Sequence, residues 1–124
     1  MATFLVLIYG DEREWAGESA ERRRDKEAAH AAFAAGAPEA GVAVLSGGEL
    51  APAAEAVSLR AGGGTLSTDG PFLETKEAIG GYYLLEAADA DLVAALARRL
   101  PELSESRGGI EIRPVRPDPA QKTE

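Results

Sequence analysis

The segment "TFLVLIY", Thr3 to Tyr9, decides the fold of this chain. Its residues favour the β conformation, and Gly10-Asp11 ends the run with a turn signal. Apolar side chains stand at successive positions, so both faces of the predicted strand are apolar, as is typical of a strand that is covered on two sides. The sheet that contains this strand therefore needs a covering layer on each face.

A helical pattern that could supply one layer begins after Ser19, a residue type that caps helix N-termini, and continues through alanine-rich sequence to about Ala40. Gly36 and Pro38 lie inside this pattern. Because Pro38 would clash with the carbonyl of Ala34 and lose a helix hydrogen bond, we expect a kink or an early end near Gly36.

A second helix is predicted over residues 90–100, "ADLVAALARRL", with Asp89 as its cap and Pro101 after its end. Its apolar residues form one stripe, which comprises Leu92, Val93, Leu96 and Leu100. Further strands are predicted at 42–45, 82–86 and 109–115. Partial alternation at 57–60 and 65–68 predicts a hairpin about the triple glycine 62–64, with a positive φ at its tip.

The predicted order is β-α-β-(β-β)-β-α-β. This order indicates a ferredoxin-like α+β fold in which two helices cover one face of a mainly antiparallel sheet. The first strand and "GYYLL", residues 81–85, carry large apolar side chains on both faces. We therefore expect a second copy of the chain to cover the other face, which gives a two-fold homodimer.

The composition indicates the class of protein and argues against some kinds of partner. With 124 residues, the chain has the length of one domain, for which we expect bounds of 1–116, followed by a frayed tail at 117–124. Thirteen basic against 21 acidic residues give a net charge of -8, which argues against nucleic acid and anionic membranes as partners. The chain has no cysteine, and its N-terminal apolar run is too short for a membrane span or a signal peptide, so we expect a cytoplasmic protein.

Two residues are candidates for catalysis. His30 is the only histidine and lies at the edge of the apolar face of the first helix. Histidine exchanges protons near neutral pH, although a helix-surface histidine without chemistry is the alternative. Asp69 precedes Gly70-Pro71, where it is either ordinary turn chemistry or a rigidly held carboxylate that orients His30 or a substrate.

Glu74, Lys76 and Arg113 are candidates for ligand binding, and Lys76 is preferred because it could contact an anionic group. The alternative is a solvated charge run. The glycine pairs at 47, 62, 80 and 108 lack the spacing of a phosphate-binding loop, so we interpret them as bulges and turns. One histidine without cysteine is also a poor basis for a metal site, and we expect neither a metal nor a cofactor.

Four segments together resemble the YCII-related, or DGPF-domain, family: "LIYGDEREW" (7–15), "GGEL" (47–50), "TDGPFLETKEAIGGYYL" (68–84) and "EIRPV" (111–115). The resemblance implies a dimeric α+β barrel built on the ferredoxin-like fold. It also implies a family whose biochemical role is not established, some of whose members occur beside or fused to sigma factors of the extracytoplasmic-function type.

The YciI branch of this family uses a histidine and an aspartate in a cleft, and the resemblance matches its histidine to His30, which lies ahead of Gly41. That branch has its aspartate in a "DP" motif after the second helix, where this chain has Leu100-Pro101-Glu102. Asp69 is then the best remaining aspartate for the pair.

Two functions stay open from the sequence. The first is a cleft between the first helix and the DGPF turn that binds a small polar molecule, with acid–base chemistry through His30 and Asp69. The second is a non-enzymatic interaction or regulatory module associated with a sigma factor. A haem-dependent or oxygen-using enzyme, as found among other dimeric α+β barrels, is a weaker third, which rests on fold analogy and His30.

Overall fold

The computed structural model describes residues 1–66 and 78–117 of the chain. The elements in chain order are β1 (Ala2–Gly10), α1 (Glu12–Ala16), α2 (Ala20–Gly36), β2 (Val42–Glu49), β3 (Ser58–Arg60), β4 (Gly63–Leu66), β5 (Ala78–Ala87), α3 (Ala90–Ala97) and β6 (Gly109–Pro114). Three short 3-10 helices join them: η1 (Pro38–Ala40), η2 (Ala53–Glu55) and η3 (Pro101–Ser104). None of the described helices is both long and apolar enough to cross a membrane.

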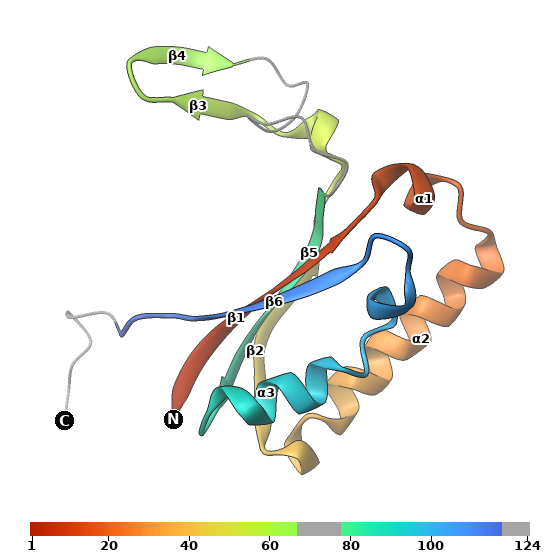
Figure 1. Cartoon of the computed structure of the whole chain (residues 1–124), viewed down its shortest axis with the longest axis vertical. Coiled ribbons are helices and arrows are strands. Elements are labelled where there is room, and N and C mark those ends of the chain that lie inside the picture. The colour runs from red at the N-terminus through yellow and green to blue at the C-terminus, as the bar shows by residue number, and fades with distance from the viewer. Residues whose placement is uncertain (67–77, 118–124) are drawn as a thin grey trace.

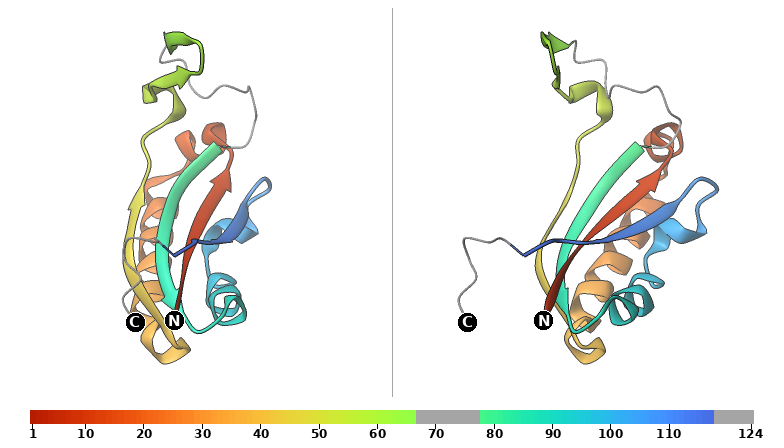
Figure 2. Two further views of the ribbon diagram at one scale, coloured as in Figure 1. Left: turned by 90° about the vertical axis from the view of Figure 1, so that its left-hand side faces the viewer. Right: turned by 60° about the vertical axis from the view of Figure 1, so that its left-hand side comes forward.

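The main sheet has four strands in the order β2-β5-β1-β6, and every neighbouring pair is antiparallel. The helices α2 and α3 lie on the same face of this sheet (Figures 1 and 2). This arrangement confirms the predicted ferredoxin-like α+β fold.

The predicted hairpin is also present, as strands β3 and β4, which form a separate two-stranded sheet. Gly63 and Gly64 belong to β4 and not to the turn, and residues 67–68 of the predicted second strand lie outside the described residues. It projects away from the main sheet and the helices (Figure 1). Gly62 has φ 83°, as expected for a glycine at the tip of the turn. At the base of the hairpin, the backbone N–H of Ala53 donates to the carboxylate of Glu12 over 2.7 Å, so that α1 holds the start of this segment.

The core lies between the sheet and the two helices. Phe4 and Val6 of β1 and Leu85 of β5 face the helices and are buried. They pack with residues of α2 and α3, among them Phe33 and Leu96. The alternation of buried and partly exposed residues along β1 reflects the two-residue period of a strand.

The helix ends follow the capping residues that the sequence predicted. The Ser19 hydroxyl accepts from the N–H of Arg22 at 3.0 Å, and Asp89 accepts from Leu92 at 3.0 Å. The first long helix ends early, at Gly36, and Pro38 begins the 3-10 helix η1 instead of kinking a longer helix.

Several elements differ from the prediction. Helix α1 was not predicted: Asp11, which was interpreted as part of a turn, caps it and accepts from the N–H of Arg13. Helix α3 ends at Ala97 because Leu100, which precedes a proline, is extended, with ψ 135°. Strands β2 and β5 are longer than expected, since the glycine pairs at 47 and 80 lie inside strands. The pair at 80 is at a bulge, one of the two predicted interpretations, because Gly80 has no partner between Ile8↔Gly81 and Tyr9↔Ile79.

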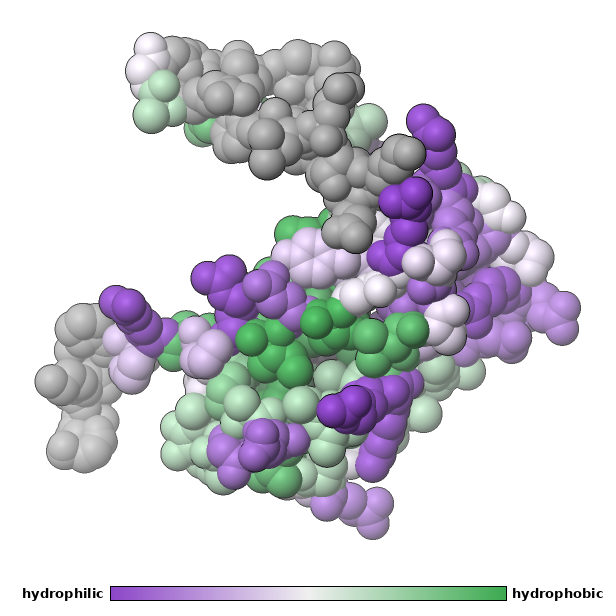
Figure 3. Space-filling view, viewed as in Figure 1, coloured by the Kyte–Doolittle hydropathy of each residue, from purple (hydrophilic) through white to green (hydrophobic). Residues whose placement is uncertain are grey.

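The face of the sheet away from the helices has no covering element among the described residues. Leu5 and Leu7 of β1 lie there, paired with Leu84 and Tyr82 of β5, and all four are partly exposed. The outer surface of α2 is mainly hydrophilic, whereas apolar side chains gather along β6 and α3 (Figure 3). We call the surface formed by Leu5, Leu7, Tyr82 and Leu84 the open face.

Candidate functional site

His30 lies on the inward side of helix α2. Arg22, Lys26 and His30 follow one another at intervals of four residues, so their side chains line one helical face, and Phe33 continues it into the core. The His30 side chain is 25% exposed. It therefore lies at the boundary between the core and the solvent.

Both ring nitrogens of His30 have a protein partner. Nε2 is 2.9 Å from Oε2 and 3.1 Å from Oε1 of Glu102, and Nδ1 is 2.7 Å from the hydroxyl of Tyr83. The rings of His30 and Tyr83 are stacked, with centroids 5.9 Å apart, and the Tyr83 ring also contacts Phe33. Three elements thus fix the imidazole: α2 carries it, η3 supplies Glu102 and β5 supplies Tyr83.

Glu102 is held by the short helix η3. Pro101 starts this helix, and the N–H of Glu105 donates to the carbonyl of Glu102 over 3.1 Å. The chain then returns so closely that a Cβ at Gly108 would collide with the same carbonyl oxygen. The carboxylate of Glu102 is only 7% exposed, so its position depends on the backbone around it.

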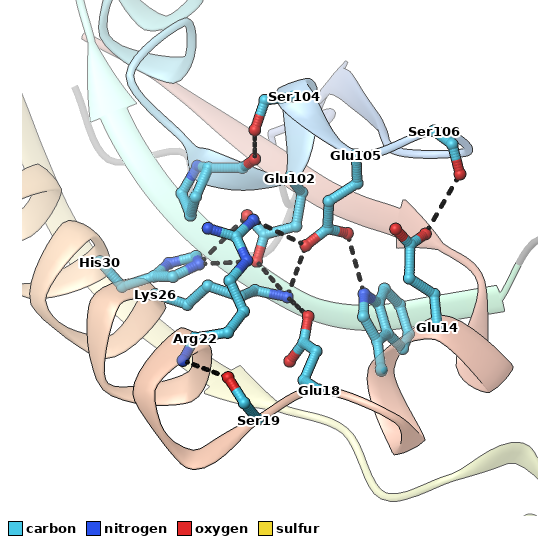
Figure 4. Close-up of polar contacts among 12 residues, drawn as sticks. Glu14, Glu18, Ser19, Arg22, Lys26, His30, Glu102, Ser104, Glu105 and Ser106 are labelled. Carbon is cyan, nitrogen blue, oxygen red and sulfur yellow. Dashed lines mark hydrogen bonds and ion pairs between the residues drawn. The ribbon is translucent and has the colours of Figure 1, made fainter.

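Lys26 links this carboxylate to two others (Figure 4). Its ammonium group donates to Glu105 at 2.7 Å and to Glu18 at 2.9 Å, and lies 3.9 Å from Glu102. All four side chains are at most 13% exposed. Burial of charges at this density requires pairing, and the three contacts of Lys26 provide it.

Trp15 and Arg22 extend the ionic cluster. The indole N–H of Trp15 donates to Glu105 at 3.0 Å, and Arg22 is 3.4 Å from the same carboxylate. The indole ring lies against the backbone of β5, because a Cβ at Gly80 would be 2.5 Å from it. These contacts join α1, α2, η3 and the main sheet at one point.

The charges of this cluster oppose the effect of burial. Burial alone would raise the pKa of Glu102, but the hydrogen bond and charge of His30, a backbone hydrogen bond and the charge of Lys26 together lower it. Burial alone would lower the pKa of Lys26, but its hydrogen bonds to Glu105 and Glu18, and the charges of both carboxylates, together raise it. Both groups are therefore charged at neutral pH.

Tyr83 behaves differently. Burial and the charge of Glu102 both raise the pKa of its hydroxyl, since each disfavours a second negative charge. The hydroxyl therefore keeps its proton at neutral pH and acts as a hydrogen-bonding phenol.

Of the candidate residues from the sequence, the structure places two. His30 is in the site described above, whereas Arg113 is on β6 with a side chain that is 66% exposed and 3.9 Å from Glu111. Glu111 and Arg113 alternate with Ile110 and Ile112, which pack against the core, so Arg113 lies on the open side of the sheet. His30 and Arg113 are therefore on opposite faces. The other candidates, Asp69, Glu74 and Lys76, lie outside the described residues.

Glu102 and Tyr83 were not among the sequence candidates. A signal existed for Glu102, because it follows Pro101 after the second helix, where the resemblance implies an aspartate. For Tyr83, strand alternation predicts only which face of the sheet the ring lies on, and not which group the hydroxyl contacts. Within residues 1–66 and 78–117, no group of three or more His, Asp or Glu side chains is placed to hold a metal ion.

The sequence matches a known protein family. The model of the YCII-related domain matches residues 2–118. The chain belongs to the YCII-related family. It is also 36% identical over 117 residues to an uncharacterized protein of Rhizobium meliloti (strain 1021), and the match covers 90% of each chain. The resemblance noted from the sequence is thereby confirmed over nearly the whole chain.

Proposed function

We propose that this YCII-related protein binds a small polar molecule beside His30 and carries out acid–base chemistry through the pair of His30 and Glu102. One observation carries the proposal: Nε2 of a partly exposed imidazole is 2.9 Å from a carboxylate that is only 7% exposed. Such a carboxylate holds the ring in one orientation and one tautomer, and it stabilises the imidazolium that forms when the ring takes up a proton.

The exposure of the two partners fits this role. A histidine that serves only the core would be fully enclosed, whereas a quarter of the His30 side chain faces solvent. Glu102 is tied to Lys26 as well as to His30, so its charge is maintained while the ring gains and loses a proton. The pair thus combines access for a ligand with a fixed counter-charge.

The DGPF segment keeps a place in the proposal. Asp69 would be a second carboxylate at the site, and Lys76 and Glu74 would contact the ligand, as expected from the sequence. Glu102 takes the orienting role first assigned to Asp69, because it contacts the imidazole directly. The role of Asp69 in this proposal is then to bind the ligand or to exchange a proton with it.

The alternative is an interaction module, and one observation favours it. The projecting β3–β4 segment exposes Val57 and Leu59 by 65% and 66%. An isolated two-stranded hairpin is marginally stable, so apolar side chains on it would gain from a protein partner. A sigma factor of the type associated with the family is such a partner, and this role would need no chemistry at His30.

A ligand screen separates the two functions. Saturation-transfer NMR with a mixture of small polar metabolites should detect binders of the wild-type protein that are lost in His30→Gln and weakened in Glu102→Gln. Glu39→Gln, which alters an exposed carboxylate in η1, is the matched control and should bind as wild type does. Molecules that bind His30→Gln and Glu102→Gln as well as they bind the wild-type protein would contradict the proposed site and favour the interaction module. A screen that finds no binding molecule would do the same.

The open face supports a homodimer as the assembly. Leu5, Leu7 and Leu84 form an apolar centre on a sheet face that a monomer would leave in water. Two such faces packed together would complete a barrel, and a stable interface of this kind buries on the order of 1,200 Å² or more in total. The site at His30 lies on the helix-covered side, so the ligand and the second copy would use different faces.

A further inference from the structure

The Tyr83 hydroxyl determines how a ligand can contact the His30 site. Glu102 occupies one ring nitrogen of His30 and Tyr83 occupies the other, so a ligand can reach a ring nitrogen only by displacing one of them. A phenol oxygen can donate one hydrogen bond and also accept. Within the described part of the chain, the contact with His30 is the one polar contact of the Tyr83 hydroxyl, so it has capacity left for a ligand.

The charge of His30 determines the direction of the hydrogen bond to Tyr83. A carboxylate only accepts, so the single N–H of a neutral ring points from Nε2 to Glu102, and Nδ1 then accepts from the Tyr83 hydroxyl. In the imidazolium both nitrogens carry a proton. Nδ1–H must then donate to the Tyr83 oxygen, and the hydroxyl proton of Tyr83 is released to point elsewhere.

We propose that Tyr83 is the catalytic residue that faces the ligand, and that it passes the proton of the His30 imidazolium to a carbonyl oxygen of a neutral small molecule. This inference rests on the proposed function, whose proton carrier it keeps. In the transfer, the Tyr83 O–H proton moves to the carbonyl oxygen while the Nδ1 proton moves to the Tyr83 oxygen. A water molecule adds to the carbonyl carbon in the same step, so that the C=O electron pair moves onto the oxygen that receives the proton. His30 ends neutral, Tyr83 ends as a phenol, the carbonyl oxygen becomes a hydroxyl and the added water loses one proton to the solvent.

A relay of this kind suits the surroundings of Tyr83. Burial and the charge of Glu102 raise the pKa of the hydroxyl, so a free phenolate is disfavoured. The relay avoids a phenolate because the oxygen receives one proton as it gives up another. The 2.7 Å separation from Nδ1 is short enough for the first of these two transfers.

The charges around the ring determine the class of ligand. From α2, Lys26 and Arg22 contribute positive charge to the cluster. The carboxylates come from the segment before α2 and from η3 with the residue after it: Glu18, Glu102 and Glu105. Three carboxylates against two cations leave one negative charge, which the imidazolium balances. The cluster therefore offers no excess positive charge to a phosphate or carboxylate, and an uncharged carbonyl compound fits it best.

The reversal of the hydrogen bond between His30 and Tyr83 can be observed without a ligand. His30 is the only histidine, so its ring signals need no assignment. Nitrogen-15 NMR of the wild-type protein should show neutral His30 protonated at Nε2. In Tyr83→Phe, the Nδ1 resonance should move downfield, as for an acceptor that has lost its donor, while the Nε2 resonance stays in place. The chain has three tyrosines, so the Raman tyrosine doublet is followed with Tyr9 and Tyr82 replaced by phenylalanine. Its intensity ratio should shift from donor-like to acceptor-like as His30 becomes charged.

Three results would overturn the inference: a neutral His30 protonated at Nδ1, an Nδ1 resonance that ignores Tyr83→Phe, or a Raman ratio that is constant through the His30 titration. The Raman measurement keeps Tyr83 and therefore decides even if Tyr83→Phe fails to fold. Failure of the proposed function is distinct, since it appears as ligand binding that is indifferent to His30→Gln. Metabolite binders that depend on His30 but are all anions would leave the proposed function standing and overturn the carbonyl assignment.

Discussion

Leu84 and Leu85 are neighbours on β5, yet they lie in different environments. Leu85 faces the helices and is fully buried among core side chains, whereas Leu84 points to the open face, opposite Leu5, and is partly exposed. The same contrast holds for Tyr83, which bonds to His30, and Tyr82, which lies 3.3 Å from Ser46. One strand therefore presents a completed surface on one side and an incomplete one on the other.

The two faces of the sheet therefore have different roles in the protein. The helix-covered face buries its apolar residues and also encloses the paired charges around Lys26, whose burial requires fixed partners. The open face has apolar residues of similar size without a cover. Hence the covered face should determine the stability of one chain, and the open face should determine how chains associate.

The largest effect is expected on the covered face. Leu85→Ala should lower the free energy of unfolding by about 2–5 kcal/mol, because it leaves a cavity among fully buried neighbours. Urea denaturation at several protein concentrations would measure it. Leu59→Ala, on the exposed hairpin, is the control and should change stability by no more than about 0.5 kcal/mol. Equal losses in both variants would contradict the division between the faces.

Association is the next largest effect. The wild-type protein should have the mass of a dimer in light scattering at micromolar concentration, and Leu84→Arg should give a monomer, because the substitution places a charge in the centre of the proposed interface. Far-UV circular dichroism should stay unchanged, since Leu84 does not belong to the core. A monodisperse wild-type monomer, or a dimer that tolerates Leu84→Arg, would rule out the two-fold model.

The contrast between the faces also explains how far the sequence could predict the fold. Local signals are sufficient where a single residue determines a boundary, as Ser19 and Asp89 do at the helix starts. They were not sufficient at residues 47–48, because a glycine pair looks like a turn until a partner strand is known, whereas a bulge of the predicted kind is present at Gly80. Gly47, for example, lies in β2 where a Cβ would be 2.8 Å from the Tyr83 ring, a contact that only the β2–β5 pairing creates.

The candidate site could likewise be predicted only in part, because local signals do not predict contacts between residues far apart in the chain. His30 was identifiable because it is the only histidine, but its partners are 53 and 72 residues away in the chain. Whether Tyr83 or Glu102 reaches the ring depends on the register of β5 and on the path of η3, neither of which has a local signature. Lys26 is one helical turn from His30, yet its role depends on carboxylates from two other segments.

The two adjacent tyrosines give a smaller, matched comparison. Tyr83→Phe should lower the free energy of unfolding by about 1 kcal/mol, because Nδ1 of His30 loses its partner in a partly buried position. Tyr82→Phe should stay within about 0.5 kcal/mol, since its contact with Ser46 is long and exposed. Thermal unfolding of both in the Leu84→Arg background removes any contribution of the interface. A larger cost for Tyr82→Phe would reverse the assignment of the two hydroxyls.

The smallest effect concerns acid stability, to which Glu102 contributes through its paired charge. Its pKa is lowered in the folded protein, so below about pH 4.5 the unfolded chain takes up a proton that the folded chain still excludes. The free energy of unfolding should therefore fall as the pH drops through this range, by less than about 1.4 kcal/mol per pH unit, the limit for one proton.

His30→Gln removes the cation and should flatten this fall, because the pKa of Glu102 then rises. Glu39→Gln should leave the slope largely intact. If urea denaturation between about pH 3 and pH 6 gives the same slope for wild type and His30→Gln, the buried carboxylate does not draw its stability from His30, and the pair at the centre of the proposed site is not electrostatically coupled.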